Sequence, residues 1–89
     1  MPVANDWRDA KVKNVNTINR NGFYWADSNS IGSPDGLDGV FVIVHWRLNH
    51  GSGAYGLQIL MALNVNAMFV RKATGASDWY SWMRIQFGA

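Results

Sequence analysis

From residue 22 onward, apolar and polar positions alternate in short runs, a pattern that predicts β-strands separated by turns. The clearest run covers residues 40–48, and its apolar set lies on one face of a strand: Val40, Val42, Val44, Trp46 and Leu48. His45 and Arg47 make the opposite face polar toward the end of the run. The start of the run is apolar on both faces, which predicts a central strand whose tryptophan lies in the core.

Four further strands are predicted over residues 23–26, 56–63, 67–72 and 79–87. The segments between them, 27–39, 49–54, 64–66 and 74–78, are rich in glycine, asparagine, aspartate and serine, which favour turns. Short connections of this kind join antiparallel neighbours. The predicted fold class is therefore all-β, a small antiparallel sheet or meander of about five strands.

The first part of the chain carries no sustained period. Residues 6–13 predict a short helix with Asp6 as its N-cap, and Val15, Thr17 and Ile18 predict a brief extended piece. Phe69 lies in an apolar context and is expected in the core. Residues 1–89 are interpreted as a single domain, of which 1–12 form an N-terminal lead.

Composition excludes several classes of protein. With no cysteine and only two histidines among 89 residues, neither a disulfide framework nor a zinc ribbon is available. The net charge is +2 and the basic residues are scattered, so nucleic-acid binding is not expected. No apolar run approaches the about 18 residues of a membrane span, and no signal peptide is evident, so we expect no membrane insertion.

Two motifs match a nucleotide-binding or a catalytic pattern in residue type and spacing, but lack the structural context that either function needs. Residues 51–56 match the spacing G-x-G-x-x-G, but a predicted strand follows them where a dinucleotide site needs a helix. Ser52, His50 and Asp78 supply the residue types of a catalytic triad, yet no strand-turn-helix elbow presents the serine. His50 is better interpreted as a loop residue, and His45 as a hydrogen-bonded residue on the mixed face of its strand.

The acidic loop offers two further alternatives. Asp27, Asp35 and Asp38 share one loop, where paired carboxylates would suit glycoside cleavage. Asp35, Asp38 and backbone carbonyls would supply oxygen ligands for calcium. Each of these aspartates also occupies a setting in which aspartate makes turns, and so short a chain has little room for a dry catalytic cleft. We therefore expect a protein that is not an enzyme and that holds no cofactor and no metal.

The aromatic residues are the candidates for binding. Several of them stand near strand ends or share a face with arginine or glutamine, where flat rings beside polar groups suit sugars. The same rings would also suit contacts between chains, or simply the core. The candidate ligand-binding or partner-binding residues are Tyr24, Trp25, Trp79, Tyr80, Trp82, Arg47 and His50.

The order of these features resembles the knob domain of pyocin fibres, which is widespread in bacteriophage tail fibres. The matching pieces are NVNTI at 14–18, GFY at 22–24, SPDG at 33–36, the apolar run 40–46, MFVR at 68–71 and WYSW at 79–82. Each motif is short, but together they extend over residues 12–87. The chain has only a short lead where a fibre would supply a shaft, so an excised domain or a small independent virion protein is expected.

The resemblance implies a knob of a phage tail fibre or phage-tail-like bacteriocin, present in the virion and made in the bacterial cytoplasm. It implies attachment to bacterial surface polysaccharide or lipopolysaccharide, contacts with other tail proteins, and a homotrimer. A purely structural role as adaptor, spacer or fibre tip is the alternative. The family's shared residues look structural: Gly22 opens a turn, Phe23 fills the core and Trp82 closes the last hairpin.

Overall fold

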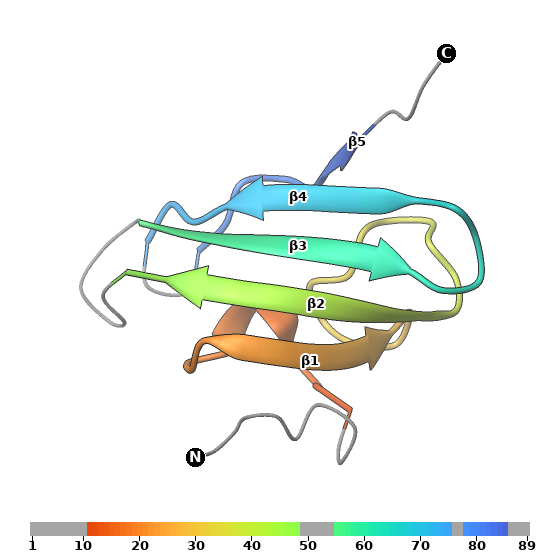
Figure 1. Ribbon diagram of the computed structural model, residues 1–89, viewed down its shortest axis with the longest axis horizontal. Helices are drawn as coiled ribbons and strands as arrows, with labels where there is room; N and C mark the ends of the chain where they lie inside the picture. Colours follow the sequence, from red (N-terminus) through yellow and green to blue (C-terminus); the bar gives the residue numbers. More distant parts are fainter. Residues whose placement is uncertain (1–10, 49–54, 76–77, 86–89) are drawn as a thin grey trace.

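A computed structural model describes residues 11–48, 55–75 and 78–85. Five strands, β1 (Gly22–Asp27), β2 (Val40–Arg47), β3 (Gly56–Ala62), β4 (Met68–Lys72) and β5 (Met83–Ile85), form one sheet. Their order in the sheet follows the sequence, β1-β2-β3-β4-β5, and each neighbouring pair is antiparallel (Figure 1). The predicted all-β meander is confirmed. In these described residues no helix is long and apolar enough to cross a bilayer.

One face of the sheet is covered by the chain segments around β1. A 3-10 helix, η2 (Val15–Thr17), begins after Asn14, whose side chain accepts a hydrogen bond from the backbone of Asn16 (2.9 Å). The backbone of Val15 donates to Ile31 (2.8 Å), which ties η2 to the 28–39 loop. In Figure 1 both segments lie behind the sheet. They form a single covering layer over one side.

The apolar core lies between this layer and the sheet. Its fully buried members are Val15, Ala26, Phe41, Ile43 and Leu60, and Phe69 packs against them as predicted. Gly39 closes the corner beside β2 with φ +100°, and a Cβ there would lie 2.1 Å from the side-chain oxygen of Asn64. That oxygen accepts the backbone N–H of Val40 (2.8 Å), so the corner requires glycine.

A hydrogen-bonded polar stripe continues the core along the same face. Nε2 of Gln58 donates to the backbone oxygen of Val15 (2.9 Å) and lies 3.1 Å from Nδ1 of His45. Oε1 of Gln58 accepts from Nε of Arg71 (2.9 Å), whose Nη2 donates to the side chain of Asn16 (2.9 Å). Because these contacts fix both ends of the amide, Nδ1 of His45 is an acceptor. His45 is thus hydrogen-bonded on its strand, as predicted.

The register of the sheet decides which alternating set is covered. Phe41, Ile43 and His45 point into the covered face, so Val44 and Trp46 point away from it. Trp46 is 46% exposed, and the prediction that it lies in the core is wrong. Phe23 pairs with Val44 and is 57% exposed, so it does not fill the core either.

Three local predictions also differ from the structure. The last strand covers only Met83–Ile85; before it, Trp79 makes an isolated antiparallel bridge with Ala73, and residues 80–82 form no strand. Residues 86–87 lie outside the described part. Residues 15–17 form a 3-10 helix instead of an extended piece, since Asn14 caps them. Of the helix predicted over 6–13, residues 11–13 are not helical and the rest lie outside the described residues.

Neighbouring cations on β4 provide a test of the polar stripe. Arg71→Met leaves Oε1 of Gln58 buried without its donor, so we expect the free energy of unfolding to fall by about 2–4 kcal/mol. Lys72→Met, at the exposed adjacent position, should change it by less than about 0.5 kcal/mol. Urea unfolding followed by circular dichroism measures both. Equal, small effects would show that the stripe does not stabilise the fold.

Candidate functional site

Two tryptophans from the β4–β5 connection lie over the polar stripe. Trp79 donates its indole N–H to the backbone oxygen of Asn16 (3.2 Å), and Trp82 donates to that of Gly32 (2.7 Å). The guanidinium carbon of Arg71 lies 4.8 Å from the ring centroid of Trp79 and 4.3 Å from that of Trp82. Both rings are half-buried and occupied by internal contacts. The two rings cover the polar stripe on the core side of the sheet.

Burial has a direct electrostatic consequence at Arg71. It lowers the pKa of this guanidinium to about 10, because the charged form is partly desolvated. The group nevertheless stays charged at neutral pH, supported by its hydrogen bonds and by the two indole faces. The polar stripe therefore contains the positive charge of Arg71, which the rings of Trp79 and Trp82 cover.

Arg47 and Tyr24 belong to the same interior assembly. Arg47 is only 2% exposed; its Nη1 donates to the backbone oxygen of Gly75 (2.9 Å) and its guanidinium lies 5.0 Å from the Trp79 ring. Tyr24 is half-buried, meets His45 edge to face, and donates its hydroxyl to the backbone oxygen of Arg20. Burial raises the pKa of Tyr24, an effect that the charge of Arg20 opposes. Arg47 is buried in this assembly, whereas Tyr24 also lines a shallow hollow beside η2.

The predicted site residues thus separate into different environments. Tyr24, Arg47, Trp79 and Trp82 gather on the covered face, where they hold the fold. Trp25 pairs with Val42 and, by strand alternation, points to the opposite face, where it is half-buried. Tyr80 is 60% exposed. His50 lies outside the described residues.

The opposite face of the sheet is apolar and uncovered by the described segments. We call it the open face and define it by the apolar outward side chains of β1 to β4: Phe23, Trp25, Val40, Val42, Val44, Trp46, Leu57, Ile59, Met61, Met68 and Val70. Phe23, Val44, Trp46 and Met61 are each at least 36% exposed. A continuous apolar patch of this kind normally marks an interaction surface.

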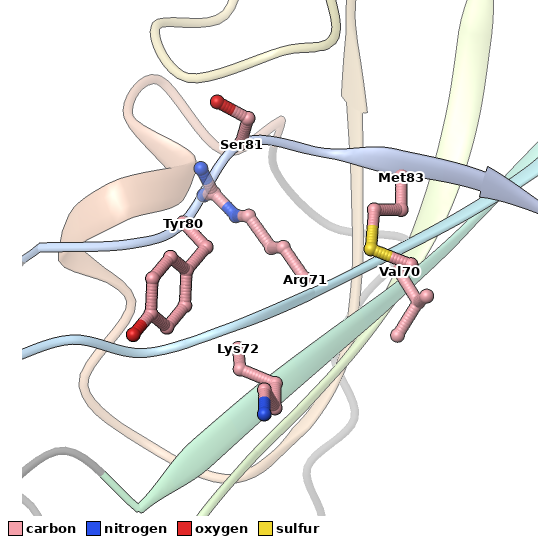
Figure 2. A pocket seen from close by; sticks show the side chains of 6 residues that line it. All are labelled: Val70, Arg71, Lys72, Tyr80, Ser81 and Met83. Atoms are coloured by element: carbon pink, nitrogen blue, oxygen red, sulfur yellow. The ribbon is translucent and has the colours of Figure 1, made fainter.

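A groove runs along the β4–β5 margin of the open face. It encloses about 620 Å³ and is lined by Val70, Arg71, Lys72, Tyr80, Ser81 and Met83. Figure 2 shows Lys72, Val70, Met83 and the ring of Tyr80 on one side of these strands, while Arg71 and Ser81 turn the other way. The backbone N–H of Tyr80 donates to the backbone oxygen of Lys72 (3.0 Å), which holds the two residues side by side.

A second hollow continues this groove toward the ends of β2 and β3. It shares Val70, Lys72 and Tyr80 with the first and adds Trp46 and Tyr55. Tyr55 is 72% exposed. Three exposed aromatic rings and one exposed cation therefore border a continuous hollow. This set combines flat apolar surfaces with few polar groups, as ligand sites do.

Three members of this site, Trp46, Tyr55 and Lys72, escaped prediction from the sequence. Trp46 was assigned to the core because its apolar run continues through Leu48. The alternation identifies which residues share a face but does not say which face is covered. The sequence does contain one signal for Lys72. Lys72 stands two residues after Val70, so both side chains lie on the same face of the predicted strand, and a cation beside an apolar residue indicates an exposed edge.

The acidic residues of the described segments show no converging arrangement. Asp27 pairs with Lys11 (3.3 Å) and accepts the backbone N–H of Asn29 (3.0 Å), a turn contact. Within residues 11–48, 55–75 and 78–85, no three histidine or aspartate side chains lie close enough to hold a metal ion. Among the sites described, the hollow around Tyr80 is the best candidate for a ligand.

Comparison with protein-family models, with characterised proteins and with solved structures gave no match for this chain. Its function has to be argued from this geometry and from the sequence resemblance.

Adjacent aromatic residues should separate the covering role from the binding role. Trp79→Ala removes the hydrogen bond to Asn16 and uncovers Arg47 and Arg71, so we expect a loss of about 3 kcal/mol in the free energy of unfolding. Tyr80→Ala removes an exposed ring and should cost less than about 1 kcal/mol. Denaturant unfolding followed by far-UV circular dichroism measures both. A large loss for Tyr80→Ala would place that ring in the core.

Proposed function

We propose that this chain is a non-catalytic knob domain of a phage tail fibre or phage-tail-like bacteriocin that contributes to attachment to bacterial surface glycans. The observation that carries the proposal is the aromatic hollow at the margin of the open face, where Trp46, Tyr55 and Tyr80 stand around Lys72. The sequence resemblance supplies the biological setting, a virion fibre that meets polysaccharide or lipopolysaccharide.

The chemistry of the hollow suits a sugar. The apolar C–H face of a pyranose stacks on an exposed aromatic ring, and Tyr80 offers such a ring with its hydroxyl at the rim. Lys72 adds three donors for hydroxyl, carboxylate or phosphate oxygens. Binding of one site is expected to be weak, because the hollow is open, and several copies on a fibre would raise the avidity.

A second role is favoured by a different observation. The open face is apolar across four strands, which suits contact with protein more than contact with sugar. The chain would then be a structural tail component, an adaptor, spacer or fibre tip, in contact with other virion subunits. The homotrimer implied by the resemblance belongs to this proposal as well.

A titration with purified bacterial lipopolysaccharide and capsular polysaccharides tests the first role. Tryptophan emission should change on binding because Trp46 borders the hollow. Tyr80→Ala should raise the dissociation constant about tenfold through loss of stacking, whereas Tyr80→Phe should keep it within about threefold.

Phe23→Ala is the matched control, since Phe23 is a similarly exposed ring on β1, at the opposite margin of the open face. It should leave glycan affinity unchanged. Glycan recognition is contradicted if the folded, assembled protein shows no response at millimolar saccharide across a panel of bacterial strains.

A further inference from the structure

We propose that the open face is the surface through which this chain binds another copy of itself, sheet against sheet. The inference deepens the structural role proposed above, on which it rests, by naming the partner and the surface. The open face shares Trp46 and Val70 with the hollow proposed for glycan attachment, but its centre lies on β2 and β3, away from the β4–β5 margin.

The chemistry of the open face argues against a sugar as its occupant. Its central members, Val42, Val44, Ile59 and Met61, offer no donor or acceptor side chain. A saccharide laid there would lose water from its hydroxyls without finding partners, a cost of about 1–3 kcal/mol for each group. An apolar protein surface has no such cost. Interfaces between identical subunits are the most apolar of protein interfaces.

The distribution of charge permits two copies to meet. The chain carries a net charge of +2, yet the outward strand positions described for β1 to β4 hold charges only at the ends, Asp27 on β1 and Lys72 on β4. The carboxylate of Asp27 is already paired with Lys11. Two open faces can therefore approach without bringing like charges together at their centres.

The size of the open face suits a small, reversible contact. Its four strands, about 4.8 Å apart and about 20 Å long, present roughly 400 Å² in projection. Pairing two such faces covers roughly 800 Å² of projected area, which is the range of weak, reversible association. Since twisted sheets pack closely at their centres and diverge at their corners, the marginal hollow around Tyr80 can stay open.

The test is the mass of the full chain by light scattering on a sizing column, with a charge placed at the centre of the face. The unmodified chain should elute at twice the mass of one chain. Val44→Lys should raise the dissociation constant of the oligomer by roughly a hundredfold or more, because the ammonium group would be buried in the interface. Ile31→Lys is the matched control, on the covering layer, and should leave the mass unchanged.

Cross-linking keeps the proposal testable if Val44→Lys fails to fold. The chain contains no cysteine, so Met61→Cys and Ile31→Cys each introduce a single thiol. A bismaleimide should join two chains through residue 61 and not through residue 31. A monomer for the unmodified chain at about 100 μM, or equal cross-linking at both positions, would overturn the proposal.

The two proposals fail separately. A monomer that binds lipopolysaccharide through Tyr80 overturns self-association and leaves glycan attachment standing. If the chain forms an oligomer that Val44→Lys disrupts but binds no saccharide, glycan attachment is overturned and self-association stands.

Discussion

The amide of Gln58 is the contact on which the arrangement of this protein depends. It lies fully buried in the middle strand of the sheet and bonds the backbone of η2, the ring of His45 and the guanidinium of Arg71. A buried polar group is tolerated only when its hydrogen bonds are made, and a buried cation requires more partners still. The face of the sheet that carries Gln58 must therefore be the face that the rest of the chain covers.

That requirement accounts for the layer above the sheet. The backbone of Asn16 and Gly32 accepts the indole N–H groups of Trp79 and Trp82, and these rings lie over the arginines. Both tryptophans precede β5, whose regular pairing with β4 covers only three residues. Aromatic residues that would suit a sugar on an open surface are thereby committed to the interior.

The same commitment leaves the opposite face to other molecules. One layer of chain covers one side of the sheet, and the apolar side chains of the other side are exposed or half-buried along four strands in the described part of the chain. Function in this protein follows from that division. The covered side supplies stability, the open face is the surface that we propose for a second copy, and the margin with Tyr80 and Lys72 is the site that we propose for a saccharide.

The sequence by itself determined the fold class, the order of strands and the two alternating sets of side chains, because strand periodicity and turn residues act locally. It also determined that Phe69 would be in the core and that His45 would be hydrogen-bonded. Only the tertiary structure decided which set is covered, since a period of two is satisfied equally by either face. The apolar set of β2 suggested a core around Trp46. Instead, Gln58 and Arg71 bond to segments 43 and 55 residues away along the chain, and these contacts cover the face of β2 that carries His45 and Arg47. The partners of Gln58 and Arg71 could not be predicted from the sequence, because they come from segments that are distant in the chain and meet only in the folded structure.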